Sequence, residues 1–119
     1  MPAAERFEDL EVWQKAHRWV LAVYKVTRQF PKEELFVLTS QLRRAAISVP
    51  SNIAEGFRRR TKADNVHRYN VAQTSLEEAR YQLMLARDLS YCDVNAVLQL
   101  LDEVARMLDS YMQTIARDM

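Results

Sequence analysis

Positively charged side chains gather in one quarter of the sequence. Residues 41–70 hold seven Lys or Arg against two acids, whereas the rest of the chain holds ten against fourteen. The seven basic residues are Arg43, Arg44, Arg58, Arg59, Arg60, Lys62 and Arg68. Lys and Arg bind the phosphates of nucleic acids and release their counterions, so this cluster predicts nucleic-acid binding by charge and shape. The alternative is structural, because basic side chains near a helix C-terminus also stabilise its exposed carbonyls.

Residues suited to other chemistry are few and scattered. His17 and His67 fall in different predicted helices, and Cys92 is the single cysteine. The adjacent acids Glu33–Glu34 and Glu77–Glu78 are not followed by a histidine at the helical spacing that a carboxylate-bridged metal pair needs. One glycine in 119 residues excludes a glycine-rich phosphate loop. We therefore expect no metal, no cofactor and no enzymatic activity.

The elements that position these residues are predicted to be helices throughout. One glycine and three prolines provide too few turns for a strand-rich fold. Apolar residues at spacings of three and four predict four helices, over about 9–30, 32–57, 61–90 and 93–115. Pro31 ends the first helix, and Thr61 or Asp64 caps the third. Asp93 caps the fourth. We expect one all-α domain over 1–119, an antiparallel up-down-up-down four-helix bundle.

The second predicted helix is interrupted within the segment AAISVPSNIAEGFRRR, residues 45–60. Pro50 removes a backbone hydrogen-bond donor, yet the apolar stripe continues in phase beyond it. The sequence therefore predicts one helix kinked at Pro50, in which nearby Ser and Asn side chains hydrogen-bond the freed backbone groups. Asn52 and Glu55 are expected to fix the bend as an i, i+3 pair. Gly56 is expected to end the helix or to pack closely against a neighbour.

The first predicted helix carries a second apolar line beside its core stripe. This line consists of Val12, Trp19 and Val26, spaced seven residues apart. A bundle needs one buried stripe from each helix, so the extra line predicts an interface between subunits of a homo-oligomer. The segment LFVL at 35–38 broadens the apolar face of the second helix in the same way. The alternative is a wide core face within one chain.

Three segments carry a resemblance to a known family. FEDLEVWQKA, LTSQLRRAAISVPSNIAEGFRRRT and YNVAQTSLEEARYQL resemble the four-helix-bundle proteins encoded in intervening sequences of bacterial 23S ribosomal RNA genes. The resemblance spans nearly the whole chain, and VPSNIAEG is its most specific part. It implies a four-helix bundle that assembles as a homopentamer. The chain is also distantly similar to the accessory variability protein of diversity-generating retroelements, which implies a basic surface that binds nucleic acid and a reverse transcriptase.

These observations favour a non-enzymatic, oligomeric protein that binds RNA or DNA through its basic residues. The alternative is a protein-interaction scaffold, or an accessory subunit of a polymerase or reverse transcriptase. No run approaches the ~20 apolar residues that a transmembrane helix needs. The start of the chain, MPAAERFEDLEVW, is acidic where a signal peptide is basic and then apolar. We expect a cytoplasmic protein without a membrane partner.

Overall fold

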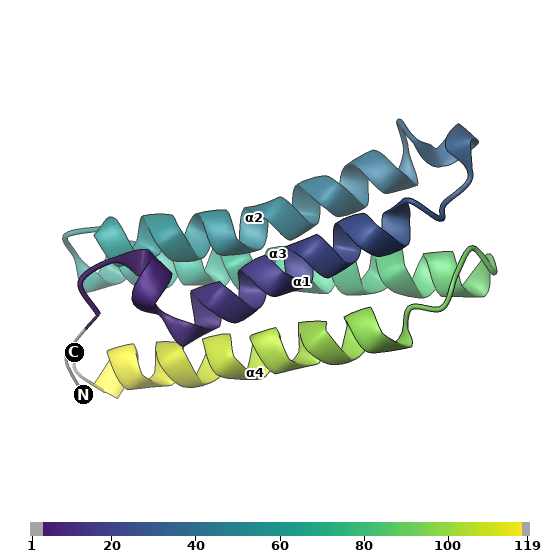
Figure 1. The fold of residues 1–119 in the computed structure, drawn as a ribbon. Helices are drawn as coiled ribbons and strands as arrows, with labels where there is room; N and C mark the ends of the chain where they lie inside the picture. Colours follow the sequence, from purple (N-terminus) through teal and green to yellow (C-terminus); the bar gives the residue numbers. More distant parts are fainter. Residues whose placement is uncertain (1–3, 118–119) are drawn as a thin grey trace.

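The computed structural model describes residues 4–117 and forms a bundle of four long helices (Figure 1). These helices are α1 Glu11–Thr27, α2 Leu38–Arg58, α3 Lys62–Asp88 and α4 Asn95–Arg117. Two short 3-10 turns, η1 Phe7–Asp9 and η2 Lys32–Glu34, precede α1 and α2. Helix α1 packs against α2 and α4, and α3 packs against the same two helices. The all-α, four-helix class is therefore confirmed.

The course of the chain decides which turns share an end of the bundle. In Figure 1 each successive helix runs back in the direction opposite to the one before it. The α2–α3 turn therefore lies at the same end as the start of α1 and the end of α4. The α1–α2 and α3–α4 connections lie at the other end.

The four helices share one apolar core that their sequence stripes predict. On α3 the buried stripe is Tyr69, Ala72, Leu76, Ala79, Leu83 and Ala86. On and just before α4 it is Val94, Val97, Leu101, Val104 and Leu108. Burying each Leu or Val side chain stabilises the fold by ~1.5–3 kcal/mol, so these stripes decide how the helices face one another.

Two helix starts follow the predicted capping chemistry. The Thr61 hydroxyl accepts a hydrogen bond from the Asp64 amide at 3.1 Å, which makes Thr61 the cap of α3. The Asp93 carboxylate accepts from the Asn95 amide at 2.9 Å and begins α4. Helix α3 ends before Ser90, whose φ of 62° turns the chain towards α4.

The connection between the first two helices differs from the prediction. Helix α1 ends at Thr27, and α2 begins only at Leu38, so the expected helix start near Lys32 is wrong. The Thr27 hydroxyl turns back to donate to the Val23 carbonyl at 2.9 Å, and Phe30 folds into the core. Residues 28–37 therefore form turns and the short helix η2 before α2 begins.

The second apolar line of α1 lies inside the bundle, which corrects the predicted subunit interface. Trp19 is fully buried and Val12 is 4% exposed, while Val26 is half-buried against the core. Since Trp19 is buried within one chain, it has no surface left for a second subunit. The line is part of a wide core face, and the oligomeric state itself stays a prediction.

Candidate nucleic-acid interface

The structure divides the seven basic residues of 41–70 into three groups. Arg58, Arg59, Arg60 and Lys62 occupy the turn between α2 and α3, and we call these four residues the basic turn. Arg43 and Arg44 lie near the start of α2, about 21 Å away at ~1.5 Å rise per residue. Arg68 lies two turns into α3. A single patch of all seven residues is therefore not formed.

Arg68 belongs to a polar network that joins α2 to α3. Its guanidinium donates to the Asn52 side-chain carbonyl at 3.4 Å and pairs with Glu55 at 3.2 Å. Asn52 in turn donates to the Ser48 carbonyl at 2.8 Å and to the Ser48 hydroxyl at 3.0 Å. The Ser75 hydroxyl of α3 completes the network by donating to the Ser48 hydroxyl at 2.8 Å. The predicted phosphate contact of Arg68 is thus a guanidinium already engaged within the chain.

Pro50, Asn52, Glu55 and Gly56 belong to VPSNIAEG, the most specific segment of the family resemblance, and each has its own local surroundings. Helix α2 is continuous through Pro50, while the kink stays a prediction. Asn52 and Glu55 both bind Arg68, so they act through a third residue rather than as the predicted pair. Gly56 is buried against Tyr69, where a Cβ atom would lie 2.6 Å from the ring, so the expected close packing is present.

The basic turn is an exposed concentration of positive charge beside this network. Arg58, Arg59 and Arg60 are exposed, and Lys62 follows them on the surface. Arg59 pairs with Glu55 at 3.9 Å, a weak contact because both side chains are largely solvated. In the part of the chain that the structure describes, Arg58 and Arg60 have no carboxylate within ion-pair distance. These guanidinium groups are therefore free to meet an anionic partner.

The alternative structural role applies to part of the basic turn. Arg58 lies in the last turn of α2, where its charge favours the exposed carbonyls. Arg59 and Arg60 lie beyond the last residue of α2, and α3 begins at Lys62. The amide end of α3, capped by Thr61, adds positive partial charge at the same place. Asp64 in the first turn of α3 partly offsets it.

Near the other end of α2, the two adjacent arginines behave differently. The Arg43 Nε donates to the Thr27 hydroxyl at 2.9 Å, and its guanidinium lies 4.6 Å from the centroid of the Tyr24 ring. These two contacts hold Arg43 against α1 in a fixed orientation. Arg44 is exposed.

An exposed apolar surface beside these arginines is the main feature that the sequence did not locate. Phe36 is 88% exposed, and Leu35, Val37 and Ile47 are also exposed. We call these four residues the apolar shelf. Leu35, Phe36 and Ile47 line, together with Arg43 and Arg44, a hollow of about 520 Å³. The LFVL segment was the signal, but its exposure follows from the late start of α2, which leaves residues 35–37 outside the helix.

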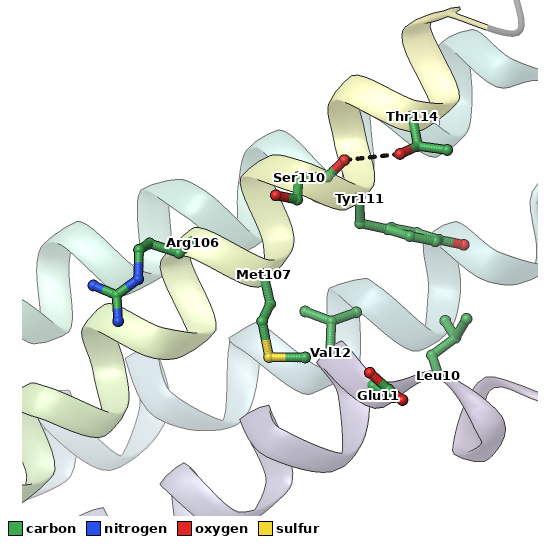
Figure 2. Close-up of a pocket in the computed structure, with 8 residues that line it drawn as sticks. All are labelled: Leu10, Glu11, Val12, Arg106, Met107, Ser110, Tyr111 and Thr114. Carbon is green, nitrogen blue, oxygen red and sulfur yellow. Dashed lines mark hydrogen bonds between the residues drawn. The ribbon is translucent and has the colours of Figure 1, made fainter.

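A second hollow lies between the start of α1 and the C-terminal half of α4 (Figure 2). It measures about 410 Å³, and Met107 and Tyr111 of α4 face Leu10 and Val12 across it. The Thr114 hydroxyl donates to the carbonyl of Ser110 at 3.1 Å, so its hydrogen is used within α4. The lining of this second hollow is mostly apolar, and it brings no acid–base pair together.

The titratable groups that are perturbed do not form a catalytic set. Burial and the neighbouring Tyr111 raise the pKa of Tyr69, and a hydrogen bond to Glu34 raises the pKa of Tyr91. Burial, followed by the Asp93 carboxylate, raises the pKa of the Cys92 thiol, which disfavours the reactive thiolate. Within residues 4–117 no three His, Cys, Asp or Glu side chains gather as metal ligands. No helix among these residues is both long and apolar enough to cross a bilayer.

The fold and the exposed basic turn define a small four-helix-bundle protein, and residues 4–117 form no recognisable catalytic centre. Residues 8–110 match the family of 23S rRNA-intervening sequence proteins. The chain belongs to this family. No curated protein matches the sequence.

A solved structure supports the same fold. It is a protein with unknown function from the S23 ribosomal protein family of Bacteroides thetaiotaomicron, with a TM-score of 0.79 and 21% sequence identity. The alignment covers 85% of this chain and 97% of that one. At this identity the likeness concerns the fold alone. Neither comparison points to a catalytic family.

Proposed function

We propose that this protein is a non-enzymatic, cytoplasmic nucleic-acid-binding protein that contacts phosphates through its basic turn. The exposure of Arg58, Arg59 and Arg60 at one end of the bundle carries the proposal, because at least two of them lack a carboxylate partner among the described residues. Each guanidinium that meets a phosphate releases a counterion and makes binding salt-dependent. The turn has no aromatic stacking platform of its own, so binding depends on charge and shape rather than on base sequence.

A titration by fluorescence anisotropy tests this proposal. Structured RNA, duplex DNA and single-stranded DNA are titrated at ~50 mM and ~200 mM salt. If binding depends on a few phosphate contacts, the higher salt concentration weakens it by one to several powers of ten. The variant R58Q/R59Q/R60Q is expected to lose most of the affinity and to flatten the salt dependence. Every sequence of one nucleic-acid type is expected to lose about the same factor.

A matched control removes the same charge elsewhere. The variant R18Q/R87Q/R106Q changes three exposed arginines on α1, α3 and α4, and is expected to retain most of the affinity. Equal losses of affinity in the two triple variants would mean that only net charge matters, and would reject the basic turn as the interface. Absence of binding by the unmodified protein at low salt would reject nucleic-acid binding itself.

The apolar shelf favours a second candidate function, that of an oligomeric scaffold. Exposed apolar surface beside polar residues is typical of protein–protein contacts, and Phe36 has few neighbours in its own chain. The partner is a further copy of the chain, and the assembly is the homopentamer that the family resemblance implies. Alternatively it is a polymerase or reverse transcriptase for which this protein is an accessory subunit. A ring would repeat the basic turn and convert weak single contacts into avidity.

Light scattering after size-exclusion chromatography tests the scaffold. The unmodified protein is expected to give a particle larger than a monomer at micromolar concentration, and F36S is expected to shift it towards the monomer. Y81S changes an exposed tyrosine on α3 that is 64% exposed, and serves as the control. A monomer for the unmodified protein, or an unchanged particle for F36S, contradicts self-assembly through the shelf.

A further inference from the structure

We propose that the corner between α1 and α2 is a binding site for a phosphoryl group. A hollow of about 160 Å³ lies there, and its lining includes Arg28, Lys32, Thr39 and Arg43. We call these four residues the anion corner. It lies at the opposite end of the bundle from the basic turn (Figure 1), so it is a separate site. A space of about 160 Å³ exceeds what a single water needs and has room for a tetrahedral phosphoryl group.

The first observation is an unused hydroxyl. Thr39 is 3% exposed, and its side chain lines the hollow. Its hydroxyl forms no hydrogen bond to any other described residue and keeps contact with solvent, since the fully buried side-chain atoms without a partner are Trp19 Nε1 and Gln82 Oε1. The neighbouring Thr27 hydroxyl, by contrast, donates to backbone carbonyls and accepts from Arg43. Thr39 is therefore available to donate to an oxygen placed in the hollow.

The second observation is a guanidinium that is already oriented. The bond from Arg43 Nε to Thr27 and the packing on Tyr24 use one N–H and one face of the group. The terminal N–H groups have no acceptor among the described residues, and Arg43 lines the hollow. Orienting this side chain before binding lowers the entropy that a ligand must overcome.

The surrounding charge favours an anion of more than one unit. Arg28 and Lys32 are exposed and line the hollow, and neither forms an ion pair with a described residue. The first-turn amides of Thr39 and Ser40 in α2 add positive partial charge, which the Glu34 carboxylate at the Leu38 amide partly offsets.

Two carboxylates lie near the anion corner. Glu34 accepts from the Tyr91 hydroxyl at 2.6 Å and from the Leu38 amide at 3.4 Å. Glu33 is exposed, and neither acid lines the hollow. Three cations and a hydroxyl around one small space suit the several oxygens of a phosphoryl dianion better than a single carboxylate.

Two sources supply such a group, a free phosphorylated compound or the terminal phosphate of a nucleic-acid strand. The second source rests on the proposed function, whereas the first does not. Both are probed by nuclear magnetic resonance on the full chain. Inorganic pyrophosphate is titrated against the labelled protein while the amide of Thr39 and the Nε–H of Arg43 are followed, and a 5′-phosphorylated oligonucleotide is compared with its 5′-hydroxyl form.

We expect saturable shifts at Thr39 and Arg43 with pyrophosphate. Because hydrogen bonds to charged groups are stronger than neutral ones, R43Q and T39V are each expected to weaken binding about tenfold or more. R44Q removes the same charge one residue away from the lining and is expected to change binding by less than about threefold. R58Q/R59Q/R60Q leaves the anion corner intact and is expected to retain pyrophosphate binding.

Three results overturn the proposal. The first is the absence of saturable shifts at Thr39 and Arg43, or shifts spread equally over all basic residues. The second is equal weakening by R44Q and R43Q while T39V has no effect. The third is binding of glutarate as tight as that of pyrophosphate, which makes the corner a carboxylate site for an acidic protein segment. A nucleic-acid titration that fails while pyrophosphate still binds rejects only the proposed function.

Discussion

Gly56 is the single glycine of the chain, and its position leaves no room for a side chain. A Cβ atom there would lie 2.6 Å and 2.9 Å from two ring carbons of Tyr69, which is 1% exposed and closely surrounded. Alanine favours a helix over glycine by about 1 kcal/mol, whereas overpacking a core costs about 1–3 kcal/mol. The clash decides the outcome, because a buried ring cannot move aside freely.

We therefore predict that G56A lowers the free energy of unfolding by about 1–2 kcal/mol and the melting temperature by roughly 5–10 °C. Thermal and urea unfolding measure the change. S51A, at an exposed position of the same helix, is the control and is expected to be neutral or slightly stabilising. A stability for G56A at or above that of the unmodified protein contradicts the contact with Tyr69.

Ser90 is a second residue whose local conformation affects stability, here through backbone strain. Its φ of 62° lies in the left-handed region that glycine adopts most readily. The Tyr91 amide donates to the Ala86 carbonyl at 2.9 Å, and the Ser90 amide to Arg87 at 2.9 Å, so the turn closes the end of α3.

S90G is predicted to raise the free energy of unfolding by about 0.5–1 kcal/mol, since the left-handed strain removed exceeds the extra entropy of the unfolded chain. Urea unfolding is the measurement. S110G places the same substitution at an exposed site inside α4 and is expected to lower stability by a similar amount. Two changes of the same sign would argue against a left-handed Ser90.

At the scale of elements, α2 and α3 are joined by a partly buried polar contact as well as by apolar packing. The Ser75 hydroxyl donates to that of Ser48 at 2.8 Å, and Asn52 donates to the same Ser48 oxygen at 3.0 Å. Removing one hydroxyl leaves its partly buried partner with an unmet hydrogen bond, which costs about 1 kcal/mol. Removing both leaves fewer unmet groups.

We predict that S48A and S75A are non-additive, with the double variant more stable than the sum of the two single losses by about 1 kcal/mol. A double-mutant cycle by urea unfolding gives this coupling. S48A paired with S110A, which lies on α4, is the control cycle and is expected to show no coupling. Additive losses for Ser48 and Ser75 would mean that the contact contributes nothing specific.

The same scale shows why some elements were predictable and one connection was not. The stripes of α3 and α4 follow a strict helical period and are bounded by Thr61 and Asp93, so local sequence and tertiary packing agree. Between the first two helices, Pro31 correctly marks an interruption. Its extent depends on Phe30 entering the core and Glu34 meeting Tyr91, contacts between residues far apart in the sequence.

The sequence predicted which residues are basic at the candidate site, but not how they are arranged in space. Counting charge along residues 41–70 found the arginines, but the helix places Arg44 about 21 Å from Arg58 along its axis. The engagement of Arg68 depends on its meeting Glu55 across two helices, which no local pattern encodes. The apolar line on α1 correctly predicted that these side chains are covered, but not that the same chain covers them. The width of a core face depends on how the four helices pack.

At the scale of the whole molecule, charge is unevenly shared among the four long helices. Helices α1 and α2 together carry six Lys or Arg against two acids, whereas α3 and α4 carry six against seven. This imbalance favours approach of an anion to α1 and α2 and to the turn that ends α2. Both the basic turn and the anion corner lie on these two helices or at their ends.

Buried or hydrogen-bonded tyrosines make the stability of the molecule sensitive to alkaline pH. The pKa values of Tyr69 and Tyr91 are raised above their ordinary value of 10.0 by burial and by the bond to Glu34 respectively. Their stabilising contribution is fully present below about pH 10 and is lost as the pH rises towards the folded pKa, because the unfolded chain ionises first. We predict that the free energy of unfolding falls steeply above about pH 10, and that Y69F flattens this fall. Urea unfolding across an alkaline pH series measures it, and an unchanged slope in Y69F would place the sensitivity on other groups.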